Sequence, residues 1–442
     1  MTKARKQMHL GAILSGVGTT QNGWLDPGLP GDASVDIDWY IDNARKAEAA
    51  RFDLVFIVDS PFITPDTAPH FLNRLEPLTL LSAVAVATSR IGLAGTLTAS
   101  YWEPFNVARQ FASLDLISKG RAGWNVVTTG LEGAARNYGR DTHFDHALRY
   151  RRAGEFLEVV KGLWDSYEDD AFPRDKAAGV FLDKAKLHRL DHKGEFFSVA
   201  GPLNIQRSRQ GQPVIFQAGE SAEGRAFGAA IAEGIYSNAE SFEQAREFYA
   251  DVKGRAAALG RDPDHIVILP GLVPIIADSD EEAQNGKLDL DKALVQLGRP
   301  FNYHDFRQYD LDAPFPDVSG LTLNSYKGHA ERIVRTARQE GLTLRQTAWH
   351  FAARANPFVG TAATVADEIE RWFLGGASDG FNLRVTSPTD FARFIDQVVP
   401  ILQARNLFRR DYAHDTLRGH LGLPFPENRH ALAREQLAVA AE

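Results

Sequence analysis

Short apolar runs recur along the chain, and most are followed by a segment whose apolar residues have helical spacing. Within each run the apolar positions are consecutive rather than alternating, as expected of strands that are buried on both faces. Four of the helical segments are clear, at 38–52, 105–118, 151–164 and 365–376. The eight predicted strands are 7–14, 53–58, 90–96, 121–129, 213–218, 234–237, 266–277 and 379–385.

Eight strand-then-helix units favour a TIM-like (β/α)₈ barrel over an open parallel sheet. Two stretches do not fit the simple repeat, and we interpret residues of about 165–212 and 280–360 as insertions between barrel units. The sequence has no linker, low-complexity tract or internal repeat. It therefore predicts one elaborated α/β domain over residues 1–442.

Charge and cysteine content narrow the class of protein. The formal net charge is −8, which argues against nucleic acid or an anionic membrane as a partner. There is no cysteine, which excludes disulfides, zinc–thiolate sites and a thiol nucleophile. The N-terminus is basic but has no long apolar run, so we expect neither a signal peptide nor a membrane span, and a cytoplasmic protein.

Polar residues fall at the ends of four predicted strands. They are Asp59, Thr96, Asn125 and Ser221. Each alone is typical of a helix cap or a turn. In a barrel, however, the carboxyl ends of the strands share one rim, which is where such folds carry their chemistry. Their coincidence therefore predicts a site on that rim.

The stretch "QAGESAEGR" (217–225) follows one of these strands and opens a helix. A glycine turn, a serine and free helical N–H groups are typical of an anion-binding corner, and Arg225 could add charge. A plain loop with a capping serine is the alternative. The stretch is neither a Walker A loop nor GxGxxG. After the first strand, Gly16 and Gly18 are followed by Gln21 where a third glycine is needed, so no nicotinamide fingerprint is found.

Three further residues are candidates for hydrogen bonding or proton transfer. His146 and Tyr150 lie four residues apart, on one face of a predicted helix, unless they simply face solvent. His304 lies in the second insertion, and insertions over a barrel mouth often act as lids. An ordinary exposed loop histidine is the alternative there. The grouping of His143, Asp145 and His146 matches no metal site, and we expect no metal.

Longer motifs resemble a known family. The stretches "LEPLTLLSAVA", "YWEPFNVARQFASLDLISKGRAGWNVVTT", "KGEFFSVAGPLNIQRSRQGQPVIFQAG" and "DTLRGHLGLP" are similar to the nitrilotriacetate, dibenzothiophene-sulfone and pristinamycin synthase A monooxygenases. These belong to the bacterial luciferase-like, FMNH₂-dependent enzymes. The resemblance runs from about residue 7 to about residue 425.

The resemblance implies a TIM-like barrel with insertions, a homodimer or homotetramer, and two-component chemistry. An NAD(P)H:FMN reductase would supply FMNH₂, which the enzyme would use with O₂. The substrate would be a small organosulfur, amine or aminocarboxylate compound, with C–S or C–N cleavage. The resemblance places His304 at the substrate as a catalytic residue and the FMN phosphate at Ser221. The FMN contacts that it implies are Asp59, Thr96, Asn125, His146, Tyr150 and Ser221.

One segment departs from the family pattern. Many members read "GxWRHP" after the first strand, whereas this chain has Gly23-Trp24-Leu25-Asp26-Pro27, without the basic pair. That segment lies near the substrate side, so a relative's substrate does not transfer directly. Two alternatives stay open from the sequence. They are a deazaflavin-dependent oxidoreductase on the same fold and an FMN-binding protein without turnover.

Overall fold

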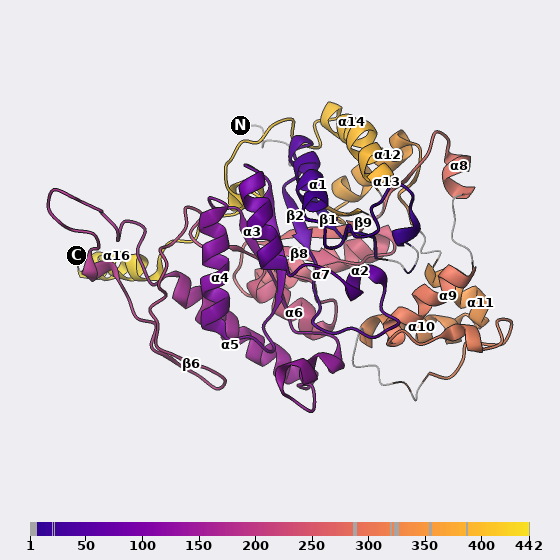
Figure 1. Ribbon diagram of the computed structural model, residues 1–442, viewed down its shortest axis with the longest axis horizontal. Helices are drawn as coiled ribbons and strands as arrows, with labels where there is room; N and C mark the ends of the chain where they lie inside the picture. The colour runs from indigo at the N-terminus through magenta and orange to yellow at the C-terminus, as the bar shows by residue number, and fades with distance from the viewer. Residues whose placement is uncertain are drawn as a thin grey trace.

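Eight parallel strands close into a barrel in the computed structural model (Figure 1). The structure describes residues 7–19, 21, 23–285, 290–318, 321, 327–352, 356–385 and 388–441. Around the barrel the strand order is β1-β12-β9-β8-β7-β4-β3-β2. The barrel strands are β1 (His9–Leu14), β2 (Leu54–Ile57), β3 (Gly92–Thr98), β4 (Ala122–Val127), β7 (Val214–Gln217), β8 (Gly234–Ser237), β9 (Val267–Leu272) and β12 (Gly380–Val385).

The predicted barrel and its eight strands are confirmed, with one strand divided. The apolar run 266–277 forms β9 and then a separate strand β10 (Ile275–Ile276), which pairs outside the barrel with β11 (Val359–Gly360). Pro274 stands between the two strands, and a proline has no N–H for a sheet ladder. β9 itself contains Pro270, so a proline alone does not end the strand; β9 ends at Leu272, two residues before Pro274.

Helices surround the barrel, and several of them begin at side-chain caps. Asp36 accepts a hydrogen bond from Asp38 N ahead of α1, and Ser241 accepts one from Gln244 N ahead of α7. Among the described residues the α-helices are α1 (Ile37–Ala49), α2 (Pro69–Leu72), α3 (Pro77–Ala87), α4 (Pro104–Ile117), α5 (His146–Trp164), α6 (Ala222–Ile231), α7 (Phe242–Ala258), α8 (Asp280–Asn285), α9 (Leu290–Gly298), α10 (Lys327–Gln339), α11 (Leu344–Ala352), α12 (Ala362–Leu374), α13 (Pro388–Arg393), α14 (Val399–Ala404), α15 (Leu417–His420) and α16 (Arg429–Ala441).

The main core lies between the barrel and this helical layer. Trp124 of β4 is fully buried and its ring packs 5.4 Å from Phe111 of α4 and 5.9 Å from Phe156 of α5. Its indole N–H donates to Leu97 O at 3.0 Å, so burial leaves no polar atom of this ring unpaired. Outward-facing strand residues thus join the barrel to its helices.

The inward-facing residues of the barrel strands form a second core. A segment late in the chain closes this core at the amino ends of the strands. Leu417, Leu421 and Leu423, in and after α15, pack with Phe56 and Phe216 inside the barrel. Gly92 and Gly123 leave room for Leu417, because a Cβ on either would lie 2.4 or 3.1 Å from its methyl groups. The next residue, Arg418, is 1% exposed and its guanidinium pairs with Glu233. We call residues 414–423 the barrel plug.

Two long segments stand apart from the repeat (Figure 1). Between α5 and β7 lies an arm that carries the hairpin of β5 (His192–Lys193) and β6 (Ser198–Val199), close to α16. Between β10 and β11 lie α9, α10 and α11. These three helices and the turns between them, which we call the insertion bundle, have their own buried cluster, with Phe301 and Phe306 near its centre.

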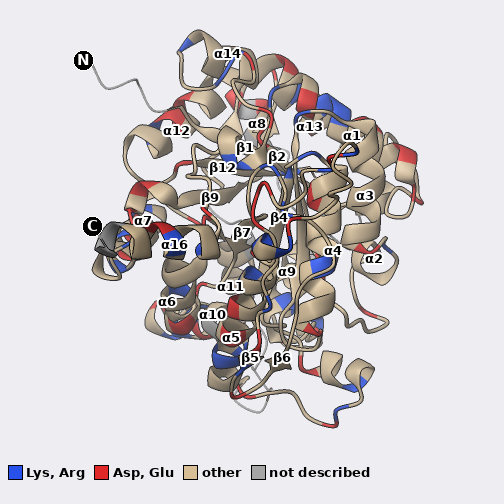
Figure 2. Ribbon diagram, turned by 90° about the vertical axis from the view of Figure 1, so that its left-hand side faces the viewer, with Lys and Arg blue, Asp and Glu red and all other residues tan. Residues whose placement is uncertain are grey.

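Charges of both signs are spread over the molecule. Figure 2 shows Lys and Arg interspersed with Asp and Glu along the helices and loops of that side. No helix within the described ranges is both long and apolar enough to cross a membrane.

Candidate functional site at the carboxyl end of the barrel

Two of the predicted residues meet inside the barrel, near the carboxyl ends of β3 and β4. Thr96 and Asn125 are register partners, and both are 3% exposed. Asn125 Nδ2 donates to Thr96 Oγ1 at 2.9 Å. Asn125 Oδ1 is buried and accepts no hydrogen bond in the part of the chain that the structure describes. A buried acceptor without a donor is costly, so this oxygen is suited to a donor from a bound ligand.

Asp59 follows β2, the neighbour of β3 in the barrel. Arg74 holds its carboxylate at 2.9 Å from the guanidinium. Burial nevertheless raises the pKa of Asp59, with Arg74 acting in the opposite direction. Asp59 therefore lies at the predicted rim as an acceptor that is partly neutralised by its cationic partner.

The turn between β7 and α6 has the form that the sequence predicts. Ser221 is the N-cap of α6, and its Oγ accepts a hydrogen bond from Gly224 N at 3.0 Å. Gly219 and Gly224 lie back to back beside the Tyr150 hydroxyl. A Cβ on either glycine would lie 2.8 Å from the other's backbone and 3.0 Å from Tyr150 Oη. Glycine at both positions therefore allows the turn, the start of α6 and the Tyr150 hydroxyl to approach closely. We call Gly219, Ser221, Gly224 and Tyr150 the cradle.

His146 and Tyr150 lie on the same side of α5, as predicted, and they face the start of α6. Their rings meet edge-on with centroids 5.1 Å apart. His146 Nδ1 lies 3.8 Å from the carboxylate of Glu223, in the first turn of α6. The cradle is therefore bordered by two helices, whose chain segments are some seventy residues apart in sequence.

Arg225, in contrast, does not supply charge to this cradle. Its guanidinium donates from Nε to Glu220 O at 3.1 Å and from Nη1 to Asp251 Oδ2 at 3.1 Å. It also lies over the ring of Phe248, on α7. Any anion at the cradle would be held by backbone N–H groups, hydroxyls and the helix dipole rather than by this cation.

His304 lies in the insertion bundle, where its described partners belong to the bundle itself. Its Nε2 is 3.0 Å from Tyr309 Oη, and its ring meets Phe306 edge-on at 5.0 Å. Two arginines of the bundle contact the barrel mouth. Arg299 lies over the ring of Phe71 of α2, 5.2 Å from its centroid, and Arg332 pairs with Glu240, just after β8, at 3.1 Å. The bundle therefore stands against the rim on the β2 and β8 sides.

The sequence reasoning missed three inward-facing polar residues on the opposite wall, Tyr236, Asn382 and Arg384. Alternate residues of β12, Gly380, Asn382 and Arg384, face into the barrel, whereas Phe381, Leu383 and Val385 pack in the outer core. Arg384 donates to Tyr236 Oη and to Asn238 Oδ1. The signal was present in "GFNLRV", where every second residue is small or polar.

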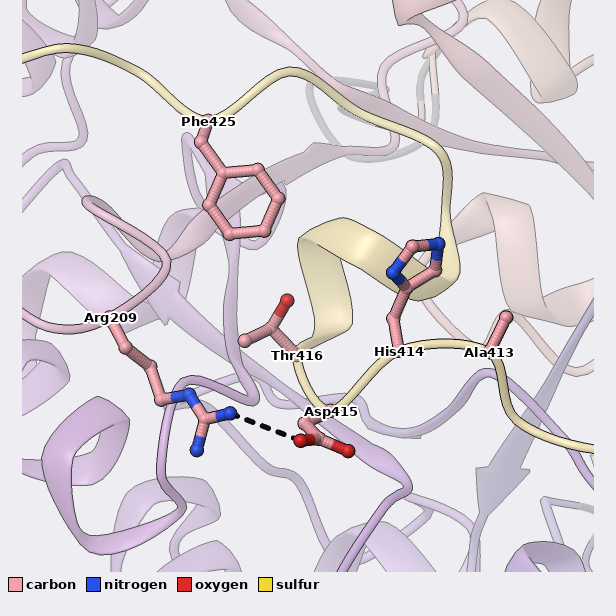
Figure 3. Close-up of a pocket in the computed structure, with 6 residues that line it drawn as sticks. All are labelled: Arg209, Ala413, His414, Asp415, Thr416 and Phe425. Atoms are coloured by element: carbon pink, nitrogen blue, oxygen red, sulfur yellow. Dashed lines mark hydrogen bonds and ion pairs between the residues drawn. The ribbon is translucent and has the colours of Figure 1, made fainter.

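A surface cavity lies away from this rim. The cavity of Figure 3, about 320 Å³, is lined by Arg209, His414, Asp415, Thr416 and Phe425, at the barrel plug. Arg209 and Asp415 form an ion pair at 3.2 Å across it. It therefore opens at the amino ends of the strands, away from the rim residues. Within the described residues no cluster of His, Asp and Glu could hold a metal ion.

Comparisons with known proteins agree with this arrangement. The profile of the luciferase-like monooxygenase family matches residues 18–379. The chain is 46% identical to N-acetyl-S-(2-succino)cysteine monooxygenase of Bacillus subtilis (strain 168), over 98% of this chain and 100% of that one. It is 40% identical to nitrilotriacetate monooxygenase component A of Aminobacter aminovorans, over 96% and 98%.

The solved structures agree as well. The crystal structure of riboflavin lyase with modified FMN and riboflavin has a TM-score of 0.81 and 32% identity, over 96% of this chain and 98% of that one. These matches confirm the resemblance noted in the sequence. The chain belongs to the luciferase-like monooxygenase family, and the protein is an enzyme of that family.

Proposed function

We propose that this protein is the oxygenating component of a two-component system, which uses FMNH₂ and O₂ to oxidise a small organic substrate. The observation that carries the proposal is the cradle formed by Gly219, Ser221, Gly224 and Tyr150 on the same rim as Thr96 and Asn125. One end of that rim suits a phosphate and the other suits a polar ring. A flavin mononucleotide has both.

The residues present fit the cofactor. Ser221, Tyr150 and the first N–H groups of α6 would hold the phosphate, with His146 beside them. Asn125 Oδ1, which is buried without a donor, would accept from an N–H of the flavin ring, and Thr96 and Asp59 would complete that end. When bound, reduced flavin supplies the electrons that activate O₂.

The protein itself would orient the reactants and keep water away. The inward-facing walls of the barrel and the insertion bundle would enclose the site, which protects reactive species from side reactions. His304, held by Tyr309, would contact the substrate or move a proton at its Nε2. The insertions at 165–212 and 280–360 would thus be additions to a single domain, the second of which covers its mouth.

We place the substrate among small compounds that carry several carboxylates around a thioether or an amine. Two relatives are named for such compounds, N-acetyl-S-(2-succino)cysteine and nitrilotriacetate. Oxidation of the carbon beside sulfur or nitrogen would lead to C–S or C–N cleavage. The chain's own "GWLDP" segment, in place of the basic pair of many members, argues for a substrate of its own within this class.

The electrons would come from a separate NAD(P)H:FMN reductase, because the described fold is one barrel and the sequence has no dinucleotide fingerprint. The name "component A" of one relative is in keeping with such a division. We further propose a homodimer or homotetramer and a cytoplasmic location.

A reconstitution tests the proposal. The protein is mixed with NADH, FMN, O₂ and N-acetyl-S-(2-succino)cysteine, with and without an unrelated FMN reductase. We expect product only when the reductase, or chemically reduced FMN, is added. Steady turnover without a reductase would contradict the two-component assignment. No oxygenation of any organosulfur or aminocarboxylate compound with FMNH₂ would contradict the proposed substrate class.

A further inference from the structure

His70 lies at the rim of the barrel, in the short helix α2 of the loop that follows β2. Its ring is 2% exposed. Its Nδ1 is 2.9 Å from the Oγ of Ser34, in the loop that follows β1. Figure 1 shows α2 between the barrel and the insertion bundle, and the next residue, Phe71, contacts Arg299 of that bundle. His70 therefore joins the first two loops of the rim, on the side that the bundle contacts.

The partners of Ser34 decide which ring nitrogen of His70 carries the hydrogen. Val17 N donates to Ser34 Oγ at 3.1 Å, and a Cβ on Gly16 would lie 2.4 Å from this oxygen, so the turn after β1 is closed around the hydroxyl. Within the described residues, His70 Nδ1 is the one acceptor for the hydroxyl's own hydrogen. Pairing every group of Ser34 therefore makes its hydroxyl donate to Nδ1, which leaves the ring hydrogen on Nε2.

The ring of His70 is neutral near pH 7. Burial lowers the pKa of His70 to about 3, and Arg74 acts in the same direction. A neutral imidazole has one donor, which is here the Nε2–H. In the part of the chain that the structure describes, Nε2 has no hydrogen-bond partner. A donor that is so little exposed and has no acceptor is costly, so Nε2 is suited to an oxygen of a bound molecule.

Arg74 adds a second donor of the same kind. It follows His70 by four residues, and its side chain is 9% exposed. Its Nη2 is 2.9 Å from the carboxylate of Asp59 and donates to Ser60 O at 2.6 Å. Its Nη1 is buried and has no acceptor among the described residues. Asp59 balances the charge of Arg74, and Glu76 lies close enough to raise the pKa of Asp59 further. The two donors therefore lie where negative charge is already present.

From this geometry we infer that His70 Nε2 and Arg74 Nη1 bind an uncharged carbonyl oxygen of the substrate, such as that of an amide. An anion would meet the carboxylates of Asp59 and Glu76, whereas a carbonyl oxygen accepts hydrogen bonds without adding charge. The inference rests on the proposed function, since it names a group of the substrate that the rim recognises. Among the compounds considered above, N-acetyl-S-(2-succino)cysteine carries such a carbonyl in its acetamido group.

The test compares two compounds that differ only in the acetamido group. N-acetyl-S-(2-succino)cysteine and 2-(2-carboxyethylthio)succinate, which lacks that group, are titrated by calorimetry into protein saturated with FMN. One variant, His70→Asn, keeps an acceptor for Ser34 and removes the Nε2 donor. A second, His70→Gln, keeps a donor near the position of Nε2. The matched control is His420→Asn, which removes another buried histidine, in the barrel plug. FMN affinity is measured for every variant.

We expect wild type to bind the acetamido compound roughly 10-fold more tightly than the analogue, as for one or two hydrogen bonds to buried donors. His70→Asn should lose roughly 10-fold for the acetamido compound and less than about twofold for the analogue. His70→Gln should lose only about threefold for the acetamido compound, because it restores a donor. His420→Asn should change neither affinity by more than about twofold, and FMN affinity should be unchanged throughout.

Equal affinity of wild type for the two compounds would overturn the inference, as would an equal loss for both in His70→Asn. Weaker FMN binding by His70→Asn would place the donor at the flavin and overturn it too. If His70→Asn does not fold, Ser34→Ala decides, since it keeps the ring but removes the hydroxyl that sets its tautomer. Ser34→Ala should lose about threefold for the acetamido compound alone, and no loss would overturn the inference. A protein that prefers the acetamido compound through His70 but never oxygenates it with FMNH₂ would contradict the proposed function alone.

Discussion

Ser221→Ala separates two roles that one hydroxyl can have at the start of α6. As a cap, Ser221 Oγ accepts one hydrogen bond, from Gly224 N at 3.0 Å, and losing it should lower the free energy of unfolding by about 1 kcal/mol. As a ligand, the same hydroxyl would donate to the FMN phosphate. A charge-assisted hydrogen bond of that kind contributes about 1.5–3 kcal/mol, which corresponds to roughly a 10- to 150-fold weaker FMN complex.

The next barrel helix supplies a matched control. Ser241 caps α7 with a hydrogen bond from Gln244 N at 3.2 Å, and Ser241→Ala removes the same kind of cap. Both variants should therefore show a similar, small drop in melting temperature. FMN and FMNH₂ affinities are measured by fluorescence titration, the latter without oxygen. Only Ser221→Ala should weaken them. A lowered melting temperature with unchanged flavin affinity would leave capping as the sole role of Ser221 and would refute the phosphate assignment.

Three further predictions test the cradle, the bundle and the core. Gly224→Ala should weaken FMN binding at least about tenfold, because the new Cβ would lie 2.8 Å from Gly219 C. The control is Gly254→Ala on α7, where a Cβ would meet no other atom. This variant should keep its FMN affinity, and its free energy of unfolding should rise by about 0.5–1 kcal/mol. Titration and urea unfolding measure both. His304→Ala should lower product per O₂ severalfold and release more peroxide with FMN affinity unchanged. The partly exposed His265 serves as the control, and His265→Ala should change none of these quantities. Equal coupling in both variants would exclude a role for His304. Burial raises the pKa of Asp115 to about 6, so between about pH 4 and 6 the folded state binds more protons than the unfolded state and stability falls as pH rises. The free energy of unfolding of Asp115→Asn, measured with urea and compared with wild type, should therefore rise by about 2–3 kcal/mol between pH 4 and pH 7. A difference between the two proteins that does not change with pH would show that Asp115 does not titrate in this range.

The barrel could be predicted from the sequence because its strands are buried on both faces. Each therefore forms a short apolar run, and observed and predicted strand ends agree within about two residues, except where Pro274 divides the run 266–277. The pairing of His146 with Tyr150 follows equally directly from helical spacing. These features depend on residues that are close in sequence.

What escaped prediction depends on partners that are distant in sequence. From the sequence Arg225 could add charge to the cradle, but Asp251, on the following helix, holds it elsewhere. Tyr236 and Arg384 are 148 residues apart, and their contact exists only because β8 and β12 both flank β9 in a closed barrel. In a continuous apolar run, the sequence does not show which residues point into the barrel, because this depends on how the strands pair when the barrel closes.

The barrel plug bears on how the protein is made. The interior of the barrel needs Leu417, Leu421 and Leu423, and its first strand pairs with β12, the last of the barrel. A ribosome delivers these segments only after the preceding 379 residues, which include the other seven barrel strands, have been made. Until then the nascent chain carries an unclosed parallel sheet with unsatisfied strand edges, a state that is prone to aggregation. Closure of the barrel must therefore wait until β12 and the barrel plug have been made, and a chain that stops before Leu417 should be unstable.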